Sequence, residues 1–176
     1  MPDFPLAIRL VNQISIATFS PESIGGSFAP QFTTSFAWPS ANLAIYIPVE
    51  IYEPVTVVKM AVNNGSVVSG NIDVGIYDAL GNKLASAGST AQTGTSAIQI
   101  FDITDTLLLP GLYYMAVALD NTTGTLAGFQ SGTAQVLEGA GLFQQASAFA
   151  LPSPATYAAM AQTVVPLVSM SLKSTI

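Results

Sequence analysis

The carboxylates of Asp73 and Asp78 are the first candidates for chemistry, because they lie five residues apart in the apolar run NIDVGIYD. Two carboxyl groups can share acid–base work only when both reach the same point. An odd spacing along one strand places the two side chains on opposite faces of a sheet. Asp78 also begins DALGN, where a turn favours aspartate, and Asp73 shares the face of Tyr77, which we expect to be solvated. We therefore interpret both aspartates as parts of a hairpin.

The other carboxylates give no better pair. Glu50 and Glu53 are three residues apart at a strand end, so the same alternation separates them. Asp102 and Asp105, in FDITDT, flank a strand exit and are typical of turn residues. Two alternatives stay open: a calcium site built from Asp102, Asp105 and backbone carbonyls, and a glycosidase pair assembled from distant strands.

Several other chemistries are excluded by missing residue types. The chain has no histidine and no cysteine, which removes Ser-His-Asp and Cys-His systems, histidine and thiolate metal sites, and disulfides. Gly25-Gly26 is not followed by the lysine of a phosphate-binding loop. We expect no catalytic residue, no metal and no cofactor, so the chain is not predicted to be an enzyme.

Charge and composition limit the partners. The net charge is −6 with only four basic residues, too few for the basic patch that nucleic acid requires. No apolar run approaches the roughly 18 residues of a membrane span, and MPDFPLAIRLVNQ lacks a signal peptide, so we expect a product made in the cytoplasm without a membrane partner. Charged residues make up only 8% of the chain and hydrophobic residues 50%, which favours a surface that meets other protein. The alternative is a monomer with a Ser/Thr-rich coat.

Apolar residues recur with period two, as in LAIYIPVEI at residues 43–51, and turn residues follow at short intervals. This pattern predicts about eight strands in an antiparallel sandwich or barrel. Pro166 places the closing strand TVVPLVSMSL at an edge or a bulge. Residues 154–163, PATYAAMAQT, are the one candidate for a short helix, and residues 121–153 are expected to form a long connection with little regular structure.

Residues 1–40 hold five of the eleven prolines and an aromatic set at even positions, which an extended chain places on one face: Phe28, Phe32, Phe36 and Trp38. Such rings bury large apolar areas. One interpretation is an arm that lies on a neighbouring subunit, and the other is an arm that seals its own sandwich core. A carbohydrate platform formed by Trp38 with nearby tyrosines is a third.

Two stretches carry a resemblance that covers residues 43–176. LLLPGLYYMAVALDN, preceded by NIDVGIYDALGNKLASAG, resembles the PG-x-YY strand and the strand–turn–strand of phage virion jelly-roll domains, although PG-x-YY also occurs in secreted carbohydrate-binding sandwiches. LFQQASAFALPSPATYAAMAQTVVPLVSMSL is similar to their C-terminal part, where a small-residue run, an ASAF-x-LP element and a proline-containing last strand close the sandwich. That family has no catalytic motif, so the resemblance implies a structural or binding role in a virion.

Together these observations predict an all-β protein: an N-terminal arm over residues 1–40 and an antiparallel β-sandwich of jelly-roll type over residues 41–176. The predicted function is that of a structural phage virion protein, a capsid decoration (cement) protein that stabilises the particle through protein–protein contacts. The expected partners are its own copies, as a homotrimer, and other virion proteins such as the major capsid protein. A receptor- or glycan-binding domain of a tail tip or fibre is the alternative.

Overall fold

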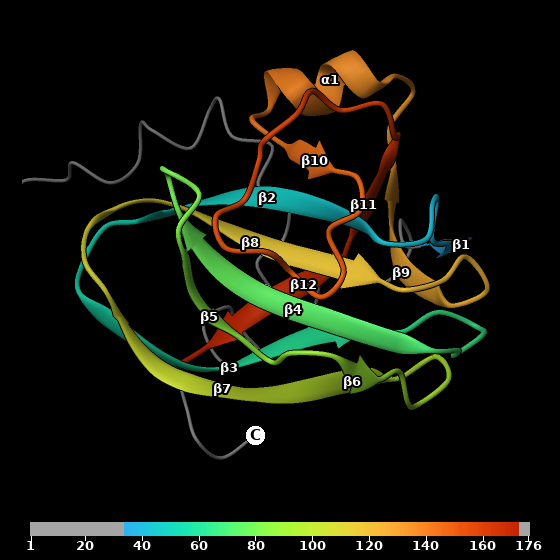
Figure 1. The fold of residues 1–176 in the computed structure, drawn as a ribbon, viewed down its shortest axis with the longest axis horizontal. Helices are drawn as coiled ribbons and strands as arrows, with labels where there is room; N and C mark the ends of the chain where they lie inside the picture. The colour runs from blue at the N-terminus through green and yellow to red at the C-terminus, as the bar shows by residue number, and fades with distance from the viewer. Residues whose placement is uncertain (1–33, 173–176) are drawn as a thin grey trace, which may run out of the picture.

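The computed structural model describes residues 34–172, which form short antiparallel strands and one short helix (Figure 1). The elements in chain order are β1 (Thr34–Ala37), β2 (Leu43–Ile51), β3 (Val55–Asn63), β4 (Asn71–Asp78), β5 (Lys83–Ser86), β6 (Thr90–Ala91), β7 (Ile98–Leu108), β8 (Gly111–Leu119), β9 (Thr125–Gln130), α1 (Ala134–Gly139), β10 (Phe143–Gln145), β11 (Val164–Pro166) and β12 (Val168–Ser171). The predicted antiparallel β-sandwich is confirmed.

One layer of the sandwich is a sheet in the order β10-β2-β8-β4-β5, with β6 paired to the start of β4. Its centre is β8, which pairs along its whole length with β2 and over seven residue pairs with β4. In Figure 1 these strands cross the middle of the molecule.

The second layer consists of two ladders, β1-β9-β11 and β12-β3-β7. The closing strand joins them: Pro166 at the end of β11 pairs with β9, Leu167 donates its N–H to Ala127 and accepts one from Asn63, and Val168 then pairs with β3. The prediction that Pro166 places this strand at an edge or a bulge is confirmed, because β11 and β12 are each the edge strand of their ladder.

The strand pairs of the two layers are nested along the chain. β2 pairs with β8 in the first layer, and β3 pairs with β7 in the second. The chain therefore passes from one layer to the other at the β2–β3 turn and returns at the β7–β8 turn. The neighbouring strands β4 and β5 then extend the first layer beyond β8. The β2–β3 and β7–β8 turns thus join the two layers of the sandwich.

The main core lies between the layers and follows the period-two pattern of the sequence. Ile72, Val74 and Ile76 of β4 face inward and are fully buried with inward residues of the other strands. Full burial of each such side chain contributes on the order of 1.5–3 kcal/mol. Alternation therefore fixes the register of these strands, since a slip by one residue would turn every apolar side chain outward.

Three expectations about boundaries are corrected. The sheet begins at Thr34, before residue 41, because β1 pairs with β9. Residues 154–163 form no helix, and Ala158 instead forms a bridge with Gln144. Residues 121–153 contain β9, α1 and β10, so that stretch is not an irregular connection.

The structure between residues 34 and 172 contains no helix that is long and apolar enough to cross a membrane. Its helix α1 has six residues, of which Leu137 is buried in the main core. α1 therefore contributes one side chain to the main core.

Candidate functional site

Asp78 is part of a hairpin turn, as predicted. Its carboxylate accepts hydrogen bonds from the backbone N–H of Leu80 and of Asn82, both at 2.9 Å, and from the Asn82 side chain at 2.8 Å. Burial is the largest single influence and raises the pKa of this carboxyl, but the hydrogen bonds from Asn82, Leu80 and Gly81 together outweigh it and lower the pKa below the usual value. The charged carboxylate is therefore used to hold the β4–β5 turn.

Asp73 does share the face of Tyr77, but that face is not solvated, so this expectation was wrong. The Asp73 side chain is 0% exposed, and its Oδ2 accepts the backbone N–H of Leu151 at 3.0 Å. Its Oδ1 has no hydrogen bond of standard length among the described residues. Burial raises the pKa of Asp73, opposed by the N–H of Leu151, by the Lys83 ammonium and by the N–H groups of Gly88 and Val74.

The outer face of the first layer is buried by residues 143–158, which we name the cover segment: they begin as the edge strand β10 and then cross the outer face. Its apolar side chains form a second core with outward residues of β2, β4 and β8, and that core includes Ala148 and Leu151. The backbone of the cover segment is anchored at both ends: Ala148 donates to the carbonyl of Asn42, and Ala155 donates to the carbonyl of Gly81.

Polar side chains fix the cover segment in place. Tyr46 donates to the Gln145 side chain at 2.9 Å, Tyr77 to the carbonyl of Pro152 at 2.6 Å, and Tyr157 to the carbonyl of Asp78 at 3.0 Å. Burial is the main cause of a raised pKa for all three hydroxyls, so they stay protonated and donate. The Lys83 ammonium donates to the carbonyl of Leu151 at 2.7 Å, while Asp73 accepts the N–H of the same residue.

The aromatic rings of the sheet and of the cover segment pack against one another. Tyr46 meets Tyr77 and Tyr157 edge-on, with ring centroids 5.3 and 5.0 Å apart, and Phe143 stacks on Tyr157 at 5.3 Å. Tyr46, Tyr77 and Tyr114 are buried. The three buried rings present no open face on which a sugar could stack, while Phe143 and Tyr157 are half-buried.

The aromatic set of residues 1–40 is only partly described. Phe36 and Trp38 are 8% and 1% exposed and lie in the main core, where the Trp38 indole donates to the carbonyl of Leu43 at 3.0 Å. These two rings therefore follow the interpretation in which the segment seals its own sandwich, and Trp38 forms no carbohydrate platform. Phe28 and Phe32 lie outside the described residues.

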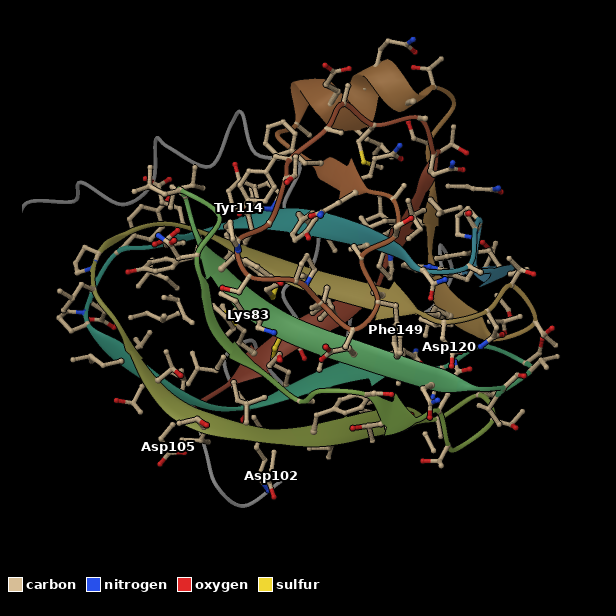
Figure 2. The ribbon with its side chains drawn as sticks, in the orientation of Figure 1. Lys83, Asp102, Asp105, Tyr114, Asp120 and Phe149 are labelled. Atoms are coloured by element: carbon tan, nitrogen blue, oxygen red, sulfur yellow. The ribbon has the colours of Figure 1, made fainter. Side chains whose placement is uncertain are left out.

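Asp102 and Asp105 are not turn residues. Both are exposed in the middle of β7, which continues through them to Leu108. Asp102 pairs with the Lys59 ammonium of β3 at 3.6 Å. Figure 2 shows both aspartates at one margin of the molecule, away from Lys83 and Tyr114.

The described carboxylates form no metal-binding group. No cluster of three or more Asp, Glu, His or Cys side chains in residues 34–172 could hold a metal ion. Glu50 and Glu53 are exposed at the β2–β3 turn, where Glu50 accepts a hydrogen bond from Tyr52. Asp73 has no exposed surface, so no substrate reaches it in this structure.

Large apolar side chains are exposed on the described surface. Several gather on the turns at one end of the sandwich, and we name this set the apolar end: Tyr52, Leu80, Leu107, Leu109 and Leu112. Others, Ile98 and Ile100, lie on the outward face of β7. Sequence reasoning missed the apolar end, although the run LLLP before a glycine carried a signal: on a strand with one buried face, three successive leucines cannot all face inward.

No protein-family model, curated protein or solved structure matches the chain. The evidence for its function therefore lies in its own side chains. In the described residues the buried polar groups hold the fold, and several large apolar side chains are exposed.

Proposed function

We propose that this protein is a structural component that works through protein–protein contacts, and that its place is on a phage particle as a capsid decoration protein. The observation that carries the proposal is the exposure of large apolar side chains on a surface that is poor in charge. Leu80 is 85% exposed and Leu107 62%, while only 8% of the whole chain is charged. Exposed apolar surface with so little charge favours association over free solution.

A structural role is also supported by how the polar groups are used. Asp73, Asp78 and Lys83 hold backbone groups of turns and of the cover segment. The resemblance of residues 43–176 to virion jelly-roll domains adds the particle as the setting. We further propose a homotrimer and a contact with the major capsid protein.

The receptor- or glycan-binding alternative has less support. Recognition of sugars by stacking needs an open aromatic face. The described tyrosine cluster keeps Tyr46, Tyr77 and Tyr114 buried, and Trp38 lies in the main core. In the apolar end only Tyr52 is aromatic and the other four side chains are leucines, so protein contact is the use that these exposed residues favour.

The proposal is tested by locating the protein. Particles released from cells that carry the encoding gene would be purified, digested for mass spectrometry and labelled with an antibody against the folded chain for electron microscopy. We expect the chain in many copies, with label over the capsid. Label confined to the tail would favour the alternative, and absence of the chain from purified particles would contradict the proposal.

A further inference from the structure

We infer that the apolar end is the docking surface of this protein, and that it fits a protein partner with an apolar recess bordered by lysine or arginine. The inference rests on the proposed function as a particle component and adds which surface makes the contact. It is carried by the convergence of three turns, by the exposure of their leucines and by the charge around them.

The pairing of the strands brings the three turns together. β2 ends at Ile51 opposite Gly111 at the start of β8, and β4 ends at Asp78 opposite Tyr113. The β2–β3, β4–β5 and β7–β8 turns therefore lie at the same end of the sandwich, which is on the left in Figure 1. The β7–β8 turn is further held by a hydrogen bond of 2.9 Å from the Tyr113 hydroxyl to the carbonyl of Leu109.

The side chains on these turns point into solvent although the fold offers buried positions beside them. Leu108 is fully buried in the main core, while its neighbours Leu107 and Leu109 are 62% and 56% exposed. Leu80 sits at the tip of the β4–β5 turn, whose hydrogen bonds use only its backbone N–H. The leucine side chains of this end therefore contribute little to the fold, which leaves them available for a partner.

The charges around the apolar end are negative. Glu50 and Glu53 are exposed there, and Glu50 faces Leu112 across the β2–β8 ladder. Of the two cations in the described range, Lys59 pairs with Asp102. Lys83, at the start of β5, donates to the carbonyl of Leu151 and keeps its positive charge, but Glu50, Glu53 and Asp78 outnumber it at this end. A complementary partner must therefore supply positive charge around an apolar recess.

The same charges disfavour two other occupants. A second copy that docked end to end would place its Glu50 and Glu53 carboxylates against those of the first copy, and these like charges repel. An anionic bilayer would repel these carboxylates in the same way. Both occupants are outcomes that the experiment can detect.

The experiment uses purified full-length protein and purified particles grown without it. Binding to the particles is measured by co-sedimentation at increasing protein concentration, for the wild type, for the double variant Leu107→Ser/Leu109→Ser and for Ile98→Ser. Ile98 is a matched control, since it lies at the other end of β7 and is 62% exposed, as Leu107 is. Far-ultraviolet circular dichroism and thermal unfolding check that each variant keeps the fold.

We expect the double variant to bind at least about tenfold more weakly, as is usual when central apolar anchors are removed, and Ile98→Ser to bind within about twofold of the wild type. Glu50→Lys/Glu53→Lys should weaken binding, and added salt should weaken the binding of the wild type. Equal binding by the wild type and the leucine variant would overturn this inference alone. Failure of the wild type to bind any particle would overturn the proposed function and this inference with it.

Two further measurements separate the occupants. Light scattering on the free proteins should give the same mass for the wild type and the leucine variant, and a lower mass for the variant would assign the apolar end to contact between copies. Flotation with phosphatidylcholine vesicles, with and without phosphatidylserine, should leave the protein unbound. Flotation that is lost in the leucine variant would assign the surface to lipid and overturn the inference.

Discussion

The outer faces of the two layers differ in their exposure to solvent. On the first layer the outward residues of β4, among them Asp73 and Tyr77, are buried under the cover segment. On the second layer the outward residues of β7, among them Ile98 and Asp102, remain in solvent. The polar carboxylate of one face is thus buried while the apolar side chain of the other is exposed. Alternation along a strand shows which residues share a face, but whether that face meets water depends on segments far away in the chain.

The outer face of the first layer carries small residues, which allow the cover segment to approach the sheet closely. Ala44, Ala116 and Ala118 are small and fully buried there, and Gly75 lies where an added Cβ would come within 3.0 Å of the Leu151 side chain. Small outward residues let the cover segment approach the sheet, and tyrosines then fill the remaining space and bind its carbonyls. On β7 nothing comparable is present, and the outward positions carry Ile98, Ile100 and Asp102.

The largest effect is expected at Tyr46, beneath the cover segment. Tyr46→Ala removes a ring that is 0% exposed and packs against Tyr77 and Tyr157, so it should lower the free energy of unfolding by about 3–5 kcal/mol. Tyr46→Phe keeps the ring and loses only the hydrogen bond to Gln145, at a cost of about 1 kcal/mol. Urea unfolding followed by circular dichroism measures both. If Tyr46→Ala were as stable as the wild type, this face would not be a core and the comparison would fail.

A smaller and pH-dependent effect is expected at Asp73. Its pKa is raised in the folded state, so the folded protein binds a proton in a pH range where the unfolded chain has lost it. The stability that Asp73 contributes is therefore complete below the ordinary carboxyl pKa and is lost as the pH rises through the raised one. Asp73→Asn cannot titrate, and we expect it to be more stable than the wild type near neutral pH by about 1 kcal/mol, while still accepting the N–H of Leu151.

The sign of this effect can be isolated by comparing the two proteins over a pH series. Asp78 and Asp120 have lowered pKa values and lose stability as the pH falls, but they do so in both proteins and cancel in the difference. The difference in unfolding free energy should be small in acid and grow with pH to a plateau. A difference that stays constant across the series would show that Asp73 titrates normally in the folded protein.

The sequence was informative where a rule acts over a few residues. Period two located β2, β3, β4 and β8, the turn chemistry of Asp78 was confirmed by its hydrogen bonds, and Pro166 marked the irregularity of the closing strand. It also placed Asp73 and Tyr77 on one face. In each case the cause lies within one strand and its turns.

The errors concern contacts between distant parts of the chain. The solvated face predicted for Asp73 is covered by Leu151, 78 residues later, and no local pattern specifies that contact. The helix predicted from Pro154 does not form, because Tyr157 and Ala158 bind the turn at Asp78 and strand β10 instead. Helix propensity in such a short segment is weak, and packing on the sheet outweighs it. The apolar end was missed for the same reason, since it exists only once three separate turns meet.

The smallest effect is expected at Ile98, on the uncovered face. Ile98→Thr replaces one β-branched side chain by another on an outward position that is 62% exposed, so strand preference is kept and little apolar area returns to water. Its free energy of unfolding should stay within about 0.5 kcal/mol of the wild type, as for most surface substitutions. The same unfolding measurement as for Tyr46 is sufficient, and Ile103, an inward residue of β7, serves as the control through Ile103→Thr, which should cost clearly more because that side chain lies in the main core. If Ile98→Thr cost as much as Ile103→Thr, the outward face of β7 would be covered in the folded protein, and both outer faces of the sandwich would have to be regarded as buried.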